Sequence, residues 1–160
     1  MSYYQHSLAP ANGDRKLALL NSLANQFLNE ATFDQLRTKE QLGYVVWVST
    51  RDARDIISSW FLIQSSVKGC EHIRTRLDIH MDKMRKKIDK MTDEEFDTIK
   101  SAVNTRISEK DKNQQENFER IWIKELSTHK YVFDRQDKNI ALLATVTKQE
   151  FVSFFMQMYF

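Results

Sequence analysis

The fold of this chain is decided by residues 33–46, which read Phe33-Asp34-Gln35-Leu36-Arg37-Thr38-Lys39-Glu40-Gln41-Leu42-Gly43-Tyr44-Val45-Val46. Residues 36–42 are good helix formers with one β-branched side chain among them, so this segment is predicted to be helical. Gly43 follows, where helices commonly end in a left-handed residue that glycine adopts without steric cost. Residues 44–48 are aromatic or β-branched and favour a strand. The stretch therefore predicts a sharp helix-to-strand break with Gly43 as the structural corner.

Two side chains beside this corner are candidates for binding. Arg37 belongs to the last turns of the predicted helix and Tyr44 begins the strand, so both are expected at the same end of the sheet. A guanidinium has five N–H donors and a phenol has one, and both could point at a carbonyl-rich ligand lying across that end. The alternative is that Arg37 interacts only with the helix dipole and solvent, while Tyr44 buries its ring and leaves its hydroxyl in water. The spacing alone leaves both interpretations open.

The chain before the corner is predicted to contain one strand and two helices. Residues 2–8 favour a short strand, and residues 9–14 favour a loop because they contain the single proline. Asp14 is a suitable N-cap for a helix that reaches about Glu30 and buries one apolar stripe. A second, shorter helix then passes through Phe33 to the corner.

A β-hairpin is predicted directly after the corner. Residues 44–50 and 56–66 are rich in β-branched and aromatic side chains, and the charged residues 51–55 between them are few enough for an antiparallel turn. Apolar side chains occupy both faces of the first strand. One face is therefore expected to pack on helices, and the other to meet more helix or the surface of a partner.

The second half of the chain, from Gly69 onward, is predicted to be helical. Thr92 with Glu95, and Thr147 with Glu150, have the spacing of capping boxes at helix starts. Apolar residues recur every three or four positions and give four stripes. The stripes are Ile73, Leu77, Met81, Met84, Ile88 and Met91; Phe96, Ile99, Val103 and Ile107; Phe118, Ile121, Trp122 and Leu126; and Phe151, Phe154, Phe155 and Met158. The whole pattern predicts one α+β domain, an antiparallel sheet covered by helices.

Composition excludes several classes of partner. Lys and Arg number 24 against 22 Asp and Glu, a net charge of +2 that indicates neither nucleic acid nor an anionic membrane. The basic residues within 83–90 alternate with aspartates, as is typical of a solvated helix face. No segment resembles a secretory signal or a bilayer-spanning helix. Cys70 is the single cysteine, so an intrachain disulfide is excluded and a reducing, cytoplasmic compartment is favoured.

The sequence predicts no metal site. Zinc peptidases commonly hold the metal with two histidines one helical turn apart and use a nearby glutamate as general base. The four histidines are His6, His72, His80 and His129, and no two of them are four residues apart. His72 and His80 are therefore interpreted as ordinary helix-surface or boundary residues. The serine pairs also lack the turn that would expose a nucleophile.

Residues 36–46 resemble a segment from the C-terminal half of the insulin-degrading enzyme group, within the pitrilysin-like (insulinase) zinc metalloendopeptidases. The similarity continues in order through Tyr3-Tyr4-Gln5, Phe61-Leu62-Ile63-Gln64-Ser65, Met91-Thr92-Asp93-Glu94-Glu95-Phe96 and Tyr131-Val132-Phe133-Asp134-Arg135. This resemblance implies that residues 1–160 form a single C-terminal, non-zinc-binding domain, a partial repeat of the pitrilysin-like fold. It also implies a fragment of a larger protein, because the family's closing strand does not follow Tyr159-Phe160.

The resemblance further implies roles for the corner. In this family two halves close around a peptide, and zinc and the general base come from the N-terminal half, so zinc is expected in that absent half and no cofactor in this chain. Arg37 would then hydrogen-bond a substrate backbone carbonyl. Tyr44 would donate to the scissile carbonyl as it becomes an oxyanion, a contact that can contribute about 3 kcal/mol to transition-state stabilisation. The expected partners are a peptide and the N-terminal half, with homo-oligomers left open.

The segment after Val48 is more charged than the family pattern suggests, which leaves substrate preference open. The chain is expected to be inactive alone because it lacks the zinc motif.

Two alternatives remain to a substrate-binding peptidase domain. The first alternative is a non-catalytic structural or protein-interaction domain that keeps the peptidase fold. The second is a helical scaffold unrelated to peptidases, which the Gly43 corner and the hairpin would exclude.

Overall fold

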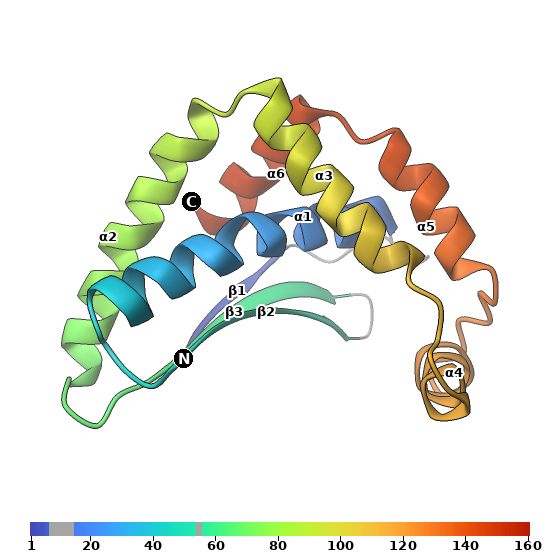
Figure 1. Cartoon of the computed structure of the whole chain (residues 1–160), viewed down its shortest axis with the longest axis horizontal. Helices are drawn as coiled ribbons and strands as arrows, with labels where there is room; N and C mark the ends of the chain where they lie inside the picture. Colours follow the sequence, from blue (N-terminus) through green and yellow to red (C-terminus); the bar gives the residue numbers. More distant parts are fainter. Residues whose placement is uncertain (7–14, 54–55) are drawn as a thin grey trace.

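The computed structural model describes residues 1–6, 15–53 and 56–160. Three strands form one antiparallel sheet in the order β1–β3–β2 (Figure 1). β1 spans Ser2–Gln5, β2 spans Val45–Ala53 and β3 spans Ile56–Gln64. The β2–β3 register pairs Val45 with Gln64, and the predicted hairpin is therefore confirmed.

The hairpin is longer than predicted at its turn. Arg51 pairs with Ser58 and Ala53 with Ile56, so most of the charged connection belongs to β2 itself. Charged side chains are tolerated there because a strand end can direct them to solvent. The predicted loop at residues 9–14, with the N-cap Asp14, lies outside the described residues, as do residues 54–55.

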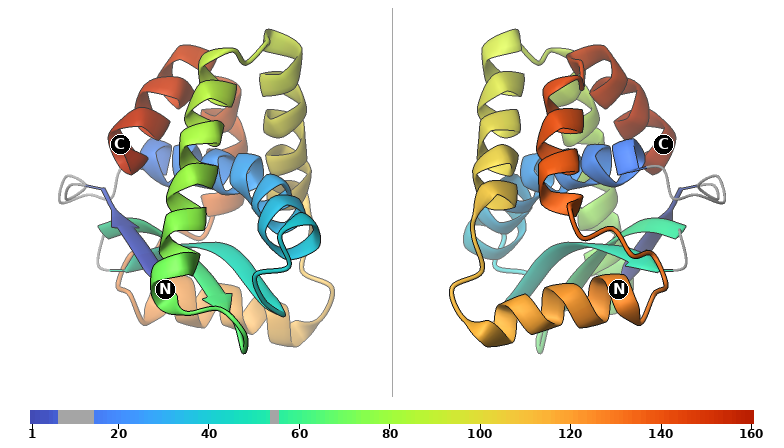
Figure 2. Two further views of the ribbon diagram at one scale, coloured as in Figure 1. Left: turned by 90° about the vertical axis from the view of Figure 1, so that its left-hand side faces the viewer. Right: turned by 90° about the vertical axis from the view of Figure 1, so that its right-hand side faces the viewer.

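Most of the helical segments lie over one face of the sheet (Figures 1 and 2). The helical segments are α1 Arg15–Thr32, the π-helical segment η1 Phe33–Lys39, α2 Cys70–Asp89, α3 Asp93–Ser108, α4 Gln114–Ile121, the π-helical segment η2 Trp122–Leu126, α5 Arg135–Ala144 and α6 Lys148–Tyr159. The arrangement is α+β, an antiparallel sheet covered by helices, as the sequence predicts. Among the described helices, none combines the length and apolarity that crossing a bilayer requires.

The core lies between the sheet and the helices. Val46 and Val48 are buried on β2, the strand that packs against α1, whereas Trp47 between them is 60% exposed. On the helix side, Phe155 of α6 contacts the rings of Phe27 and Tyr159, with centroids 5.4 and 4.8 Å apart. The aromatic stripe of α6 is therefore at the centre of the core, while the opposite face of the sheet at Trp47 is open to solvent.

Both predicted capping boxes are present. The Thr92 hydroxyl accepts from the Glu95 N–H at 3.2 Å, and the Glu95 carboxylate accepts from the Thr92 N–H at 3.0 Å. Thr147 and Glu150 make the same reciprocal pair at the start of α6. Each box satisfies N–H groups that the first helical turn leaves without a partner, which explains why the helices begin where they do.

The stripe predicted on the third helix is only partly covered, since Ile121 and Leu126 are half-buried and its two aromatic residues are exposed. α4 buries none of its residues, and Phe118 and Trp122 are each 53% exposed. Their rings stack on one another with centroids 5.8 Å apart. α4 runs along the lower edge of the molecule, away from the helix layer (Figure 2). The periodicity correctly predicted a helix, but the apolar face of that helix does not meet the core.

The route into the corner differs from the prediction. α1 continues directly into η1, so the two expected helices form one rod. The helical segment ends at Lys39, and Gln41 rather than Gly43 takes the left-handed conformation, with φ 50°. The reversal is held by two backbone hydrogen bonds, from the Glu40 N–H to the Gln35 carbonyl at 3.0 Å and from the Leu42 N–H to the Leu36 carbonyl at 2.9 Å.

Gly43 has a different role from the one predicted. A Cβ at Gly43 would lie 2.0 Å from the Gln64 carbonyl oxygen and 2.7 Å from its carbon. Glycine is therefore required because the chain passes against the backbone at the end of β3, not because of a positive φ. Tyr44 lies in a bend, and the strand begins one residue later, at Val45.

Candidate functional site

Arg37 and Tyr44 lie in contact at the corner. The Arg37 Nε donates a hydrogen bond to the Tyr44 carbonyl oxygen at 3.0 Å. The guanidinium carbon lies 4.7 Å from the centre of the Phe33 ring and 5.4 Å from the centre of the Tyr44 ring. Such cation–π contacts stabilise a fixed guanidinium orientation. Within the described residues, the N–H groups of its terminal nitrogens have no acceptor, so they remain able to bind a ligand.

Tyr44 is one of the most exposed aromatic residues of the protein. It is 84% exposed, and within the described part of the chain its hydroxyl has no hydrogen-bond partner. The phenol is therefore neither sealed in the core nor separated from Arg37 by the sheet. A hydroxyl held on a fixed backbone and open to solvent can donate to an incoming carbonyl oxygen.

Phe33 is a member of this site that sequence reasoning passed over. It is 42% exposed and stacks against Arg37 from the preceding turn of η1. The four-residue spacing between an aromatic ring and an arginine on a helix was a signal that could have found it.

An open hollow of about 780 Å³ adjoins these side chains. It lies between α1, η1 and the start of β2, so helix and strand both contribute to its walls. Residues that matter for its chemistry are Glu30, Phe33, Asp34, Arg37, Tyr44 and Trp47. Asp34 is paired with Lys39 at 2.6 Å, which leaves Arg37 as a cation available to a ligand. The hollow combines aromatic surface with a small number of hydrogen-bond donors, as ligand-binding sites do.

A half-buried ion pair joins the corner to α2. Glu40 accepts from the Nε and a terminal nitrogen of Arg76, both at 2.7 Å, and from the Gln35 side-chain amide at 2.7 Å. The hydrogen bonds from Arg76 lower the pKa of Glu40 to about 2. This carboxylate is therefore ionised at neutral and mildly acidic pH.

His80 contradicts the prediction that it lies on a helix surface. It is 1% exposed on α2, and its Nε2 lies 3.0 Å from the Thr32 hydroxyl. Its Nδ1 has no hydrogen-bond partner within the described residues. Burial lowers the pKa of His80 to about 4, because a charged imidazole would lose its hydration. His72 on the same helix is exposed, as predicted.

Because His80 is buried in its neutral form, we expect the protein to lose stability in mild acid. Unfolded histidine titrates near 6.5, so below that pH the unfolded chain takes up a proton that the folded chain does not bind until about pH 4. The contribution of neutral His80 to the free energy of unfolding should therefore be present in full above pH 6.5. The free energy of unfolding should fall by about 2 kcal/mol between pH 7.5 and pH 5. Urea denaturation at the two pH values measures this, and His80→Gln should reduce the difference.

The exposed histidine on the same helix gives the control for that experiment. His72→Gln should keep the full pH dependence, because His72 is exposed and does not share the buried surroundings of His80. An NMR titration of the intact protein that gave the His80 ring a pKa near 6.5 would contradict the argument.

The described residues contain no metal centre of the usual kind. Among them, no group of three or more His, Cys, Asp or Glu side chains could hold an ion. The His6 ring stacks on Phe154, with centroids 5.4 Å apart, and the His129 ring bonds the Tyr131 hydroxyl at 2.9 Å. His6 and His129 are thus each in contact with an aromatic residue of this chain.

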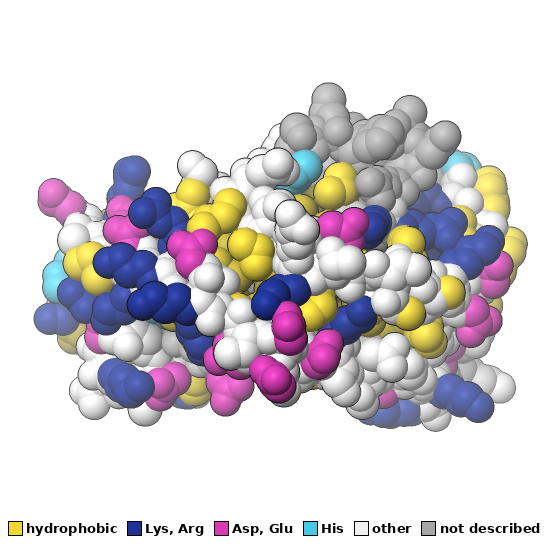
Figure 3. All heavy atoms as spheres, turned by 90° about the horizontal axis from the view of Figure 1, so that it is seen from above, with side chains coloured by type: hydrophobic (Ala, Val, Ile, Leu, Met, Phe, Trp, Pro, Cys, Tyr) yellow, Lys and Arg dark blue, Asp and Glu magenta, His cyan; other side chains and the backbone are white. Residues whose placement is uncertain are grey.

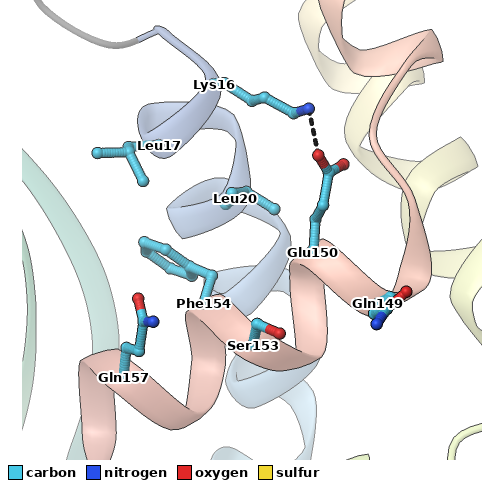
Figure 4. Close-up of a pocket in the computed structure, with 8 residues that line it drawn as sticks. All are labelled: Lys16, Leu17, Leu20, Gln149, Glu150, Ser153, Phe154 and Gln157. Carbon is cyan, nitrogen blue, oxygen red and sulfur yellow. Dashed lines mark hydrogen bonds and ion pairs between the residues drawn. The ribbon is translucent and has the colours of Figure 1, made fainter.

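Other surfaces of the molecule carry less directed chemistry. A hollow of about 400 Å³ lies between α1 and α6, with Leu17, Leu20 and Phe154 as its apolar floor (Figure 4). An ion pair between Lys16 and Glu150, at 2.5 Å, crosses it and ties α1 to the capped start of α6. This contact is structural. On the helix-covered face, Lys and Arg side chains gather over α2, and the basic residues within 83–90 are all exposed (Figure 3).

Comparisons with known proteins agree with this architecture. The family described as PQQ synthase PqqF-like, C-terminal lobe domain 4, matches residues 23–122. The insulin-degrading enzyme of Homo sapiens is 33% identical over 156 residues, 98% of this chain and 15% of that protein. The peroxisomal insulin-degrading enzyme-like 1 of Arabidopsis thaliana is 36% identical over 140 residues, 88% of this chain and 14% of that protein. The crystal structure of pitrilysin superposes with a TM-score of 0.79 and 25% identity over 98% of this chain and 16% of that one. The chain thus spans about one-seventh of the length of these curated relatives.

Proposed function

Because this chain belongs to the PqqF-like C-terminal lobe domain 4 family of the insulinase/pitrilysin metallopeptidases, we propose that it binds substrate and completes the peptide chamber of a zinc metalloendopeptidase. The observation that supports this most is the contact between Arg37 and Tyr44. Both residues line the same open hollow, and the Nε hydrogen bond joins the Arg37 side chain to the Tyr44 backbone.

Each side chain has its own part in the proposal. Arg37 donates from a terminal nitrogen to a backbone carbonyl of the peptide and fixes its register, since the guanidinium is in contact with the rings of both Phe33 and Tyr44. The Tyr44 hydroxyl donates to the scissile carbonyl oxygen. That hydrogen bond strengthens as the oxygen gains negative charge, which lowers the barrier to attack by water.

The described part of this chain does not fit a zinc ion. The described residues offer no set of three suitable donors, and the only buried histidine, His80, is bonded to Thr32 within the core. We therefore assign zinc and the general base to an N-terminal half, the proposed partner of this domain. On this proposal residues 1–160 are one C-terminal, non-zinc-binding domain of a larger protein and do not cleave peptides alone. The single cysteine favours the cytoplasm as its compartment.

Substitutions in the full-length enzyme test the two roles. Tyr44→Phe removes only an exposed hydroxyl, so folding should be unaffected while kcat for peptide cleavage falls about a hundredfold. Arg37→Ala should raise KM about tenfold, because it removes a charge-assisted hydrogen bond to the peptide backbone. Steady-state kinetics with a fluorogenic peptide measure both values.

A tyrosine outside the site provides the matched control. Tyr3→Phe, on β1 and 49% exposed, should leave kcat and KM unchanged. If both site variants cleave with the kcat/KM of the parent enzyme, the assigned roles are wrong.

A structural or protein-interaction domain is the second candidate. The exposed ring pair Phe118 and Trp122 and the solvent-open Trp47 favour it, since exposed aromatic clusters often mark protein contacts. Binding of a labelled peptide separates the two functions. Affinity that depends on Arg37 supports the peptidase module, and peptide binding unaffected by Arg37→Ala supports the interaction domain.

A further inference from the structure

We propose that Arg76 on α2 is a positioning residue for the candidate site and that it acts through Glu40 on Arg37 and Tyr44. This inference rests on the proposed function, because it explains how the two substrate-binding groups keep their relative placement. Neither Arg76 nor Glu40 lines the hollow at the site. Any effect of Arg76 on substrate must therefore pass through the residues between them.

The contact itself is more specific than an ordinary surface ion pair. Two parallel hydrogen bonds of 2.7 Å join the fork of the Arg76 guanidinium to both oxygens of the Glu40 carboxylate. The side chains are 31% and 14% exposed, so solvent screens the pair only partly. Gln35 adds a third hydrogen bond to the same carboxylate, at 2.7 Å. Exposed single-bond pairs contribute little, but a bidentate arginine pair also fixes an orientation.

Glu40 lies at the point where the chain reverses between the two binding residues. It follows the last residue of η1, and its N–H bonds back to the Gln35 carbonyl. The next residue, Gln41, has φ 50°, a conformation that non-glycine residues adopt at a cost. The side-chain tie to Arg76 therefore holds a reversal that the local backbone does not favour by itself.

The residues that follow the reversal are held by contacts other than the salt bridge to Arg76. The Leu42 N–H bonds the Leu36 carbonyl, and Gly43 packs against the Gln64 carbonyl before the chain reaches Tyr44. The Tyr44 carbonyl in turn accepts from Arg37. The hydrogen bond between Arg37 and Tyr44 thus closes residues 37–44 into a loop. Among the described residues, the bidentate salt bridge from Glu40 to Arg76 joins this loop to α2. Loss of this tie should leave the loop folded but allow Arg37 and Tyr44 to move relative to one another.

A double-mutant cycle in the full-length enzyme tests the inference. We expect Arg76→Ala to lower kcat/KM about fivefold and Arg76→Lys to have an intermediate effect, because lysine keeps the charge and loses the fork. In the Arg37→Ala background, Arg76→Ala should cost less than it does in the parent enzyme, about twofold, since one of the two groups that it positions is already gone. Arg74→Ala is the matched control, because Arg74 is 83% exposed and reaches Asp78 only at 4.0 Å.

A spectroscopic measurement gives a second readout that does not depend on catalysis. In enzyme labelled with 3-fluorotyrosine, the Tyr44 resonance is identified by its absence in Tyr44→Phe. Arg76→Ala should shift or broaden this resonance, and Arg74→Ala should leave it unchanged.

The outcomes separate this inference from the proposed function. An unmoved Tyr44 resonance, or an equal loss of kcat/KM from Arg76→Ala with and without Arg37, overturns the positioning role. If neither Arg37→Ala nor Tyr44→Phe changes cleavage, the proposed function fails. The fluorine resonance then still decides whether Arg76 positions the corner.

Discussion

Replacing Gly43 by alanine is expected to lower the free energy of unfolding by about 3 kcal/mol, because no space exists for one added methyl group. The alanine Cβ would meet the Gln64 carbonyl oxygen at 2.0 Å, and the colliding atoms are backbone rather than a flexible side chain. Gln64 is paired in register with Val45, so it cannot withdraw without disturbing the first pair of the β2–β3 ladder. The strain would therefore fall on the segment that carries Tyr44.

Chemical denaturation followed by circular dichroism measures this loss, and Gly69→Ala is the matched control. A Cβ at Gly69 has no atom within 4 Å, and the residue precedes α2 with an ordinary φ of −72°. Its substitution should cost at most about 1 kcal/mol, the difference between glycine and alanine at a helix N-cap. If both alanine variants lose the same small amount of stability, the close approach at Gly43 is not a constraint.

Gly43 also shows which part of the fold could be predicted from sequence. A glycine between a helical and a β-branched segment correctly predicted the break, because both segments carry their preferences locally. The reason for the glycine was not predictable, since it depends on Gln64, a residue far along the chain that approaches only after the hairpin has formed. The left-handed residue, which was expected at Gly43, is Gln41, two residues after the π-helical segment η1.

The same distinction applies elsewhere in the chain. The capping boxes at Thr92 and Thr147 were predictable because both partners lie within four residues of one another. The burial of His80 was not predictable, because an alternation of polar and apolar residues along α2 does not reveal that Thr32 of α1 lies opposite. α4 has helical periodicity, yet its apolar face at Phe118 stays exposed, because periodicity predicts which residues share a face and not what covers it.

The candidate site follows this pattern. Its two principal residues, Arg37 and Tyr44, were identifiable from their spacing around the corner and from a family resemblance. The salt bridge from Arg76 to Glu40 joins residues 36 positions apart and could not be inferred from a local pattern. Sequence therefore indicated which groups the site contains, while their orientation depends on tertiary contacts.

Arg135→Ala is expected to lower the free energy of unfolding by about 3 kcal/mol, because it leaves a buried carboxylate without its cation. Glu125 is 2% exposed, and it accepts hydrogen bonds from the Nε and a terminal nitrogen of Arg135 and from the Val132 N–H. Burial raises the pKa of Glu125, but these hydrogen bonds outweigh the effect and hold the pKa below its usual value. The carboxylate is therefore ionised in the folded protein and depends on Arg135 for compensation.

The pH dependence of this loss identifies its cause. Glutamate ordinarily titrates near 4.5, so the charge of Glu125 contributes stability above that pH and loses it as the pH falls. The difference between the parent protein and Arg135→Ala should thus shrink in acid. Adding Glu125→Gln to Arg135→Ala should recover about half of the loss at pH 7, because a neutral amide is less costly to bury than an unpaired charge.

The neighbouring ion pair provides a comparison on the same helix. Lys138 and Asp134 are joined at 2.8 Å with side chains 51% and 55% exposed, so Lys138→Ala should cost no more than about 0.5 kcal/mol. Urea denaturation of the three variants at pH 7 and pH 4 provides the measurement. A loss from Arg135→Ala that is as small as that from Lys138→Ala, or that does not change with pH, would mean that Glu125 is compensated by another group. The loop that begins after η2, where the Glu125 carbonyl also accepts from the Lys130 N–H at 3.0 Å, would then be held by its backbone hydrogen bonds rather than by the ion pair.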